Sequence, residues 1–445
     1  MEPVRNPYAP GAGQRPPELA GRDREIDAFE IVLERVSRGR PERSLVLTGL
    51  RGVGKTVLLN AFRSEAIGRM WGTGKIEARP EVFLRRPLAA ALHMAVRELA
   101  PQHRAPDRID DFLGTLKAFA LRGDADGGGG GGARQRGTGG TSARLRDRWQ
   151  PGIDVPARSG RADSGDIEID LVELLTDAAT LAVDVGTGIA VFIDEMQDLG
   201  AGDASALCAA CHELSQTGAP LIVVGAGLPH LPALLSASKS YSERLFRYQR
   251  IDRLDRIAAD QALVAPALRE GVEYEPKALD ALYECSGGYP YFVQSYGKAT
   301  WDHAPRSPVT AMDVRVAAPE AEAELAVGFF GSRYERATPA EREYMRIMAQ
   351  LAAASPGGAK GAEGADGGEA PAAAEHAEAS EEAASADVDA PVVTADIARA
   401  LGRKPASLSP ARDALIKKGL IYSGERGTVA FTVPHFGRFL RSQDH

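Results

Sequence analysis

Cysteine and long apolar runs are both scarce in this sequence of 445 residues, which contains three cysteines and no stretch of 18 consecutive apolar residues. Three cysteines cannot build a disulfide framework in a chain of this length. Without a long apolar run we expect no membrane-spanning helix and no membrane partner. The first residues lack the apolar segment of a secretory signal, so the expected location is cytoplasmic.

Two of the cysteines belong to the string Cys208-Ala-Ala-Cys211-His212, which matches a haem attachment site. That chemistry requires export to an oxidising compartment, and no export signal is present. Leu207, Cys211 and Leu214 recur at helical spacing, so we interpret the segment as a packed helix.

Charge is distributed unevenly around the net value of −8. Residues 355–390 hold nine acids and one base, so this segment alone carries a charge of −8, equal to the net charge of the whole chain. Residues 393–445 hold nine lysines or arginines against four acids, a balance of +5. A basic C-terminal end permits a nucleic-acid partner.

The sequence pattern predicts a fold with several domains. Buried strands are expected at 44–48, 189–193 and 221–224, with helical patterns between them, which indicates an α/β fold with a parallel sheet. We expect a disordered tail at 1–18, an α/β core at 19–255, a helical region at 256–330 and a C-terminal domain at 331–445. Low-complexity composition predicts disordered inserts at 122–166, which includes five arginines between 134 and 148, and at 353–390.

The clearest motif is the phosphate-binding P-loop G-x-x-x-x-G-K-T at residues 49–56. Glycines allow the backbone N–H groups to point at phosphate oxygens, and the N-terminus of the following helix favours negative charge. Lys55 is expected to reach the β and γ phosphates, and Thr56 to ligate magnesium. The expected cofactors are therefore ATP and Mg²⁺, and the binding residues are Gly49, Leu50, Arg51, Gly52, Val53, Gly54, Lys55 and Thr56.

Asp194 and Glu195 supply the acidic partner of this loop. They follow the apolar run 189–193, and the C-terminal end of a strand faces the ligand crevice in open α/β sheets. We expect Asp194 to hold the magnesium ion and Glu195 to orient or deprotonate the attacking water. Lys55 and Glu195 are thus candidate catalytic residues.

These motifs resemble the AAA+ ATPases, specifically the origin-recognition-complex-like AAA domains and the neighbouring STAND-type signalling ATPases. Residues 19–25, LAGRDRE, are similar to the entry segment of the family, and 286–290, SGGYP, to its lid motif. The resemblance implies a three-layer P-loop NTPase core, a helical lid and a C-terminal winged helix. It also implies that Gly21 and Arg22 lie near adenine, and that Gly288 and Pro290 approach the nucleotide from the lid.

The same resemblance implies an arginine finger, with Arg244 as the candidate and Arg247 as its alternative. Such a finger acts in trans and would require a nucleotide-dependent homo-oligomer. The position where the family carries a polar sensor residue falls on Gly225-Ala226-Gly227, which has no polar side chain. We therefore expect slow hydrolysis.

The C-terminal pattern predicts a helix, a turn and a helix over 394–419, followed by a hairpin over 420–433. In a helix-turn-helix the second helix enters the major groove of DNA, although such modules also dock proteins. The candidate DNA contacts are Arg403, Lys404, Ser407, Arg412, Lys417 and Lys418.

The function expected from the sequence is an ATP-dependent switch with slow hydrolysis, coupled to double-stranded DNA or to a protein partner. The alternative is a regulatory or scaffold protein that binds ATP without hydrolysing it and docks a protein through its winged helix.

Overall fold

The computed structural model describes residues 1–11, 13–102, 104–122, 153–354, 390–424 and 427–443. The chain divides into two compact units. One unit, here the α/β unit, contains residues 22–48 and 55–250; the other, here the helical unit, contains residues 1–21, 49–54 and 251–445. None of the described helices combines the length and the apolarity needed to cross a bilayer.

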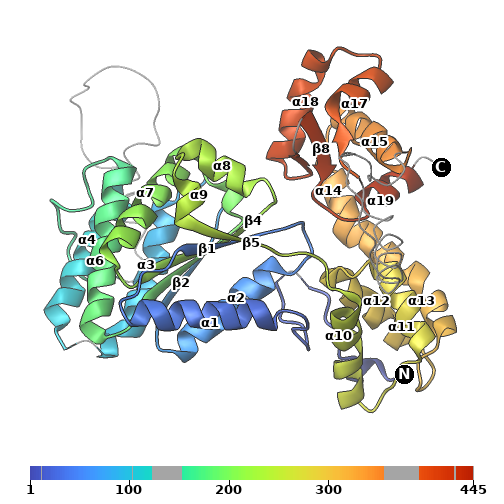
Figure 1. Ribbon diagram of the computed structural model, residues 1–445, viewed down its shortest axis with the longest axis horizontal. Coiled ribbons are helices and arrows are strands. Elements are labelled where there is room, and N and C mark those ends of the chain that lie inside the picture. Colours follow the sequence, from blue (N-terminus) through green and yellow to red (C-terminus); the bar gives the residue numbers. More distant parts are fainter. Residues whose placement is uncertain (12, 103, 123–152, 355–389, 425–426, 444–445) are drawn as a thin grey trace, which may run out of the picture. The chain divides into compact units, whose positions relative to one another are not determined.

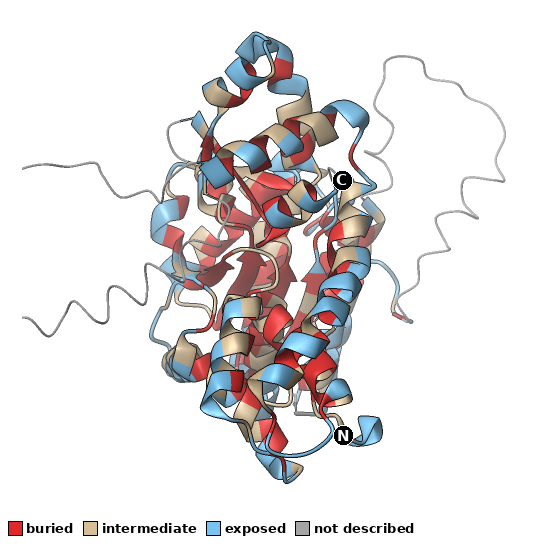
Figure 2. Ribbon diagram, turned by 90° about the vertical axis from the view of Figure 1, so that its right-hand side faces the viewer, coloured by how far each residue is buried: buried red, intermediate tan, exposed pale blue. Residues whose placement is uncertain are grey.

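The α/β unit is built on a five-stranded sheet with the order β2-β3-β4-β1-β5, and every neighbouring pair is parallel. The strands are β1 (Ser44–Thr48), β2 (Gly72–Glu77), β3 (Ile189–Asp194), β4 (Leu221–Gly227) and β5 (Phe246–Arg250). The three central strands are buried along their whole length, as their apolar sequences predict, and Figure 2 shows buried strands at the heart of the sheet.

Helices cover both faces of this sheet, so the unit has three layers (Figure 1). On one face α1 and α2 pack through Phe29 and Phe62, whose rings stack at 4.4 Å, and Phe29 reaches Phe192 of β3. The helices of the unit are α1 (Asp23–Ser37), α2 (Lys55–Gly68), α3 (Arg85–Leu99), α4 (Pro106–Arg122), α6 (Ile167–Val185), α7 (Ala201–Thr217), α8 (Leu231–Ser238) and α9 (Ser242–Leu245).

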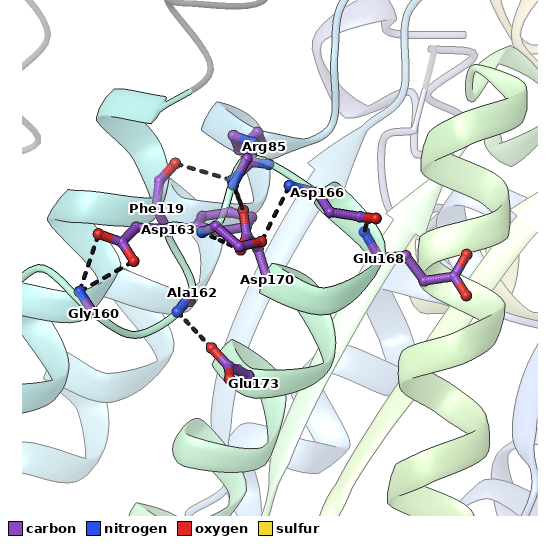
Figure 3. Close-up of polar contacts among 11 residues, drawn as sticks. Arg85, Phe119, Gly160, Ala162, Asp163, Asp166, Glu168, Asp170 and Glu173 are labelled. Atoms are coloured by element: carbon purple, nitrogen blue, oxygen red, sulfur yellow. Dashed lines mark hydrogen bonds and ion pairs between the residues drawn. The ribbon is translucent and has the colours of Figure 1, made fainter.

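A buried ion pair fixes the chain where it enters α6 (Figure 3). The guanidinium of Arg85 lies 2.8 Å from the carboxylate of Asp170, and both side chains are almost wholly buried. Asp170 also accepts hydrogen bonds from the backbone and the hydroxyl of Ser164, and Arg85 lies over the ring of Phe119. Burial opposes the charge on Asp170, but these hydrogen bonds outweigh it and lower the pKa of the carboxyl.

The helical unit begins with a group of helices that we call the lid. Its helices are α10 (Arg256–Arg269), α11 (Pro276–Ser286), α12 (Pro290–His303) and α13 (Ala311–Glu324), and a π-helix, η4 (Leu325–Gly331), extends α13. Thr310 starts α13 with a capping box, in which its hydroxyl accepts from the backbone of Asp313 while the Asp313 carboxylate accepts from the backbone of Thr310.

A C-terminal module follows the lid. Its helices are α14 (Ser332–Tyr334), α15 (Pro339–Ala354), α17 (Thr394–Ala400), α18 (Pro405–Lys417) and α19 (Phe436–Ser442). Its strands are β6 (Val392–Val393), β7 (Ile421–Ser423) and β8 (Thr428–Phe431), which form an antiparallel sheet in the order β6-β8-β7. The helix, turn and helix expected over 394–419 are confirmed as α17 and α18.

The expectation of a disordered tail at 1–18 was wrong for its described residues. A short 3₁₀ turn (Pro3–Arg5) begins the chain, and Tyr8 is buried against the lid. The Tyr8 hydroxyl donates to the carbonyl of Leu263 and lies 2.7 Å from the hydroxyl of Tyr274. The segment is rich in proline and glycine, but the buried ring of Tyr8 and the hydrogen bonds from Arg5 and Asn6 to the lid anchor it.

The first insert is shorter than the predicted range of 122–166. Residues 153–166 pack onto the α/β unit, since Ile153 and Ala162 are buried and the backbone of Ala162 donates to Glu173 (Figure 3). Residues 123–152, with their arginines, and 355–389 lie outside the described residues.

The string Cys208-Ala-Ala-Cys211-His212 lies in helix α7, so its interpretation as a packed helix is confirmed. Burial raises the pKa of Cys208 to about 11 and the pKa of Cys211 to about 12.

Candidate nucleotide-binding site

The P-loop connects β1 to the first residue of α2, which is the arrangement expected of a phosphate-binding loop. Gly52 and Gly54 have φ angles of 83° and 91°, a region that favours glycine. A side chain at Gly49 would collide with the carbonyl of Ile251, 2.2 Å from an ideal Cβ. The loop therefore has the backbone conformation that turns N–H groups toward an anion.

Lys55 and Thr56, at the start of α2, lie in the α/β unit together with the acidic end of β3. The Lys55 side chain is largely buried, with 9% of its surface exposed. The Thr56 hydroxyl hydrogen-bonds to the carboxylate of Asp194, which is itself buried. Burial raises the pKa of Asp194, although the Thr56 bond opposes the shift. A hydroxyl and a carboxylate side by side are the oxygen ligands that Mg²⁺ takes, so these residues fit the ion.

Glu195 directly follows Asp194, the last residue of β3, and its backbone is in the left-handed region, with a φ of 51°. Such a conformation is uncommon outside glycine, asparagine and aspartate, and it is concentrated at functional positions. Gln197, in the short 3₁₀ turn Met196–Asp198, donates from its side-chain amide to the Glu195 carboxylate at 2.6 Å. The candidate catalytic carboxylate is therefore held by a neighbour that the sequence reasoning missed.

Gln197 also explains the missing polar residue at the end of β4. Its carbonyl oxygen accepts from the backbone of Leu228 at 3.1 Å, and a side chain at Gly227 would meet the same oxygen at 2.9 Å. At Gly225 the space is filled by the sulfur of Met196. β4 lies between β1 and β3 in the sheet. The side-chain amide of Gln197, which contacts Leu228 directly after β4, supplies a polar group there, where the expected polar sensor residue is absent from the sequence. The only sequence signal was a polar residue two positions after Glu195.

Within the helical unit, the lid contacts the glycines of the P-loop. The backbone of Tyr291 donates to the carbonyl of Gly52 at 3.3 Å, and Pro290 lies 4.0 Å from the Cβ position of Gly54. Gly288 has a φ of 72°, and its carbonyl accepts from the backbone N–H of Leu254 at 2.8 Å. These contacts involve Tyr291 and Pro290, and the expectation that Gly288 and Pro290 approach the nucleotide stays a prediction.

The C-terminal module also reaches the loop. The backbone N–H of Arg51 donates to the carbonyl of Thr432 at 2.8 Å, directly after β8. Thr432 is fully buried, and its hydroxyl donates to the carbonyl of Gly419 at 2.6 Å. In this arrangement the N–H of Arg51 is bonded to protein, so it cannot at the same time bind a phosphate oxygen.

The remaining residues expected from the resemblance fall in separate places. Gly21 packs on α10 of the lid, where an added Cβ would lie 2.6 Å from the side chain of Ala258. Arg22 is buried at the start of α1 in the α/β unit. Arg244 is exposed in α9, and Arg247 is exposed on the edge strand β5.

The six candidate DNA contacts lie on or beside α18, and at least four of them bond to other groups of the module. Lys418 lies 2.6 Å from the buried Glu341, Arg412 donates to the hydroxyl of Ser423, and Arg403 lies 3.3 Å from Glu343. Ser407 bonds to the carbonyl of Lys404 at the start of the helix, while Lys404 and Lys417 have exposed side chains.

Comparison with known proteins supports the assignment of the nucleotide-binding domain. Residues 18–224 match the family described as the AAA ATPase domain, and residues 371–440 match a family described only as a domain of unknown function. None of the curated proteins matches the chain.

Solved structures with similar folds include the Walker-type ATPase of Pyrococcus abyssi, with 14% identity, coverage of 95% of this chain and 96% of that one, and a TM-score of 0.54. Cdc6p from Pyrobaculum aerophilum matches with 12% identity, coverage of 100% and 99%, and a TM-score of 0.39. The ORC1 protein of Aeropyrum pernix in complex with DNA matches with 14% identity, coverage of 99% and 96%, and a TM-score of 0.39.

The sheet, the P-loop and the family match agree, and the expected P-loop NTPase core with a parallel sheet is confirmed. Residues 18–224 of this chain form an AAA+ P-loop ATPase domain.

Proposed function

We propose that this protein is a Mg-ATP-binding switch that hydrolyses ATP slowly and couples nucleotide binding to its C-terminal module. The observation that carries the proposal is the buried contact between the Thr56 hydroxyl and Asp194, beside the largely buried Lys55. A lysine and a hydroxyl at the start of a helix, facing a buried carboxylate, provide a countercharge for phosphate and ligands for magnesium.

Each residue has a defined task in this proposal. The backbone of residues 49–54 and the Lys55 ammonium bind the phosphates, and Thr56 and Asp194 hold the metal. The bound Mg²⁺ neutralises charge on the phosphates. Glu195 orients the attacking water, and Gln197 holds the Glu195 carboxylate through a hydrogen bond of 2.6 Å. That bond leaves the other lone pairs of the carboxylate to accept from water, so it orients Glu195 without blocking it.

Coupling follows from the contact between Arg51 and Thr432. A phosphate that recruits the N–H of Arg51 competes with the carbonyl of Thr432 for one donor. Nucleotide binding and docking of the C-terminal module are then linked, because each changes the free energy of the other by the same amount. We propose that this module is a winged helix whose partner is double-stranded DNA or a protein.

Phosphate release by the wild type and by Glu195→Gln tests this proposal. We expect measurable release by the wild type, a loss of about 100-fold or more in the variant, and unchanged ATP affinity, because the substitution removes the base and keeps the shape. Glu273→Gln, an exposed glutamate between α10 and α11, is the matched control and should change nothing. Equal release by all three proteins would favour the alternative, a regulatory protein that binds ATP without hydrolysing it.

The exposed Arg244 supports a further part of the proposal, a homo-oligomer in which one protomer places this arginine at the nucleotide of its partner. Sedimentation with and without Mg-ATP, together with the release rate of Arg244→Ala, tests it. A monomer under both conditions, or an unchanged rate, would remove the arginine finger from the mechanism.

A further inference from the structure

Side chains from the turn after β3 occupy the space at the end of β4, where the sequence has no polar side chain. A Cβ at Gly225 would overlap the sulfur of Met196. A Cβ at Gly227 would lie 2.9 Å from the side-chain oxygen of Gln197. Met196 and Gln197 therefore fill the volume that side chains at these two positions would take, so a polar group at this end of β4 comes from another segment.

The backbone of this turn fixes the point from which the Gln197 side chain starts. Glu195, with its left-handed φ of 51°, turns the chain directly after β3, and the N–H of Asp198 donates to the Glu195 carbonyl at 2.9 Å. The intervening Met196 is fully buried. Because the backbone is already held by these contacts, ordering the Gln197 amide costs only the entropy of its own side chain.

The Gln197 amide bonds at both of its ends. Its nitrogen donates to the Glu195 carboxylate at 2.6 Å, and its oxygen accepts at 3.1 Å from the backbone N–H of Leu228, the residue directly after β4. The reversed amide would place its oxygen against the carboxylate and its N–H groups against an N–H, so only one orientation satisfies both partners. The amide therefore holds the Glu195 carboxylate at a position that the ends of β3 and β4 define together.

We propose that Gln197 is a positioning residue for ATP hydrolysis, which supplies from the turn after β3 the polar group that β4 lacks. It orients the Glu195 carboxylate, and Glu195 orients the attacking water. Because the amide bridges two strands, a displacement of the chain after β4 also displaces this carboxylate, so the rate depends on both strand ends. The inference rests on the proposed function, since Glu195 has this task only in an enzyme that hydrolyses ATP.

Two substitutions of similar size separate the two ends of the amide. Gln197→Glu keeps an oxygen for the N–H of Leu228 but replaces the donor to Glu195 by a second carboxylate. Gln197→Met keeps the length of the side chain and removes both bonds. Gln261→Glu, on the exposed face of α10, is the matched control. Single-turnover phosphate release and ATP titration are measured on the full chain for the wild type and for all three variants.

Both Gln197 variants should release phosphate about tenfold more slowly or worse, because a misplaced catalytic group loses rate without losing substrate binding. Their ATP affinity should equal that of the wild type and the control. Wild-type release by Gln197→Glu, with slow release by Gln197→Met, would mean that only the bond to Leu228 matters. That role is structural and would overturn the proposal, as would a loss of ATP affinity as large as the loss of rate.

A second background tests whether Gln197 acts through Glu195. Glu195→Asp shortens the side chain by one methylene, so its carboxylate should no longer meet the amide. In this background Gln197→Met should cause no further loss of rate, because the two residues act as one unit. Fully additive losses would overturn the proposal, since Gln197 would then act by another route. Wild-type release by Gln197→Met, with Glu195→Gln inactive, would remove this inference and leave the proposed function standing, whereas no release by the wild type would remove both.

Discussion

Charged residues behave differently in the P-loop region and in the C-terminal module. In the α/β unit, Lys55 and Asp194 are buried at positions fixed by a motif with strict spacing, and the sequence predicted their surroundings. In the C-terminal module, a balance of +5 suggested a basic face, but Lys418 and Arg403 pair with Glu341 and Glu343 of α15. The spacing of a motif determines where its side chains lie in the fold. A net charge only counts charged residues and does not show which of them face a partner.

The largest effect is expected from comparing a buried ion pair with an exposed ion pair of the same helix, α6. Asp170→Ala should destabilise the α/β unit by about 3–5 kcal/mol, because it leaves the guanidinium of Arg85 buried without its countercharge. Asp177→Ala breaks the exposed pair with Arg161 and should cost about 0–1 kcal/mol. Chemical denaturation followed by circular dichroism measures both. Equal losses would mean that burial does not distinguish the two pairs.

Lys55→Ala tests whether the buried lysine of the P-loop contributes to ATP binding and not to the stability of the fold. Wild-type protein should gain about 2.7 kcal/mol of stability at an ATP concentration 100 times the dissociation constant, because ATP binds only the folded state. The variant should fold and gain almost nothing, because the main countercharge of the phosphates is lost. Thermal shift with and without Mg-ATP measures this, and Lys298→Ala on α12 is the control for loss of one lysine. An ATP-induced shift of wild-type size in Lys55→Ala would contradict the role assigned to this residue.

Lys418→Ala tests the opposite assignment, in which a basic residue of the C-terminal module serves the fold. Its ammonium donates to Glu341, which also accepts from the backbone of Thr338. Burial opposes ionisation of Glu341, but these hydrogen bonds outweigh it and lower the pKa of the carboxyl. We expect the substitution to destabilise the module by about 1.5 kcal/mol at neutral pH.

The pH dependence of this effect has a definite sign. A carboxyl whose pKa is lower in the folded state stabilises the fold above its unfolded pKa, and this contribution is lost as pH falls through the folded pKa. The difference between wild type and Lys418→Ala should therefore be largest near neutral pH and shrink as the pH falls through the lowered pKa of Glu341, where its carboxyl becomes protonated. Hydrogen exchange of residues 339–354, followed by mass spectrometry, measures it in the full chain. A difference that grows on acidification would contradict this account of the pair.

The central part of the fold could be predicted because its strands are apolar along their whole length. Residues 44–48, 189–193 and 221–224 are confirmed as central strands. The edge strands β2 and β5 were missed, since their sequences GTGKIE and FRYQR have a neighbour on one side only and need no apolar run. The P-loop was predictable because its chemistry requires fixed residue types. Gln197 was not, because its role depends on tertiary contacts with Glu195 and Leu228.

The smallest expected effect concerns DNA binding by α18. If the module binds duplex DNA through phosphates, Arg403→Ala with Lys404→Ala should weaken binding and lower the slope of log affinity against log salt by about 1.8, which is about 0.9 for each lost contact. Both side chains are exposed, and the exposed pair between Arg403 and Glu343 is weak enough for a phosphate to displace. Fluorescence titration of a random-sequence duplex at two salt concentrations measures both quantities.

Lys418→Ala is the informative comparison in that titration, because its ammonium is committed to Glu341 and should contribute little to DNA binding. Deleting residues 356–388 should tighten binding, since this removes acids tethered beside a basic surface at a local concentration that can reach about millimolar. An equal loss for Lys418→Ala and for the Arg403 and Lys404 pair would mean that the contact surface extends beyond the start of α18. If neither the wild type nor the deletion binds at low salt, the module docks a protein instead of DNA, because a phosphate-driven interaction is strongest under that condition.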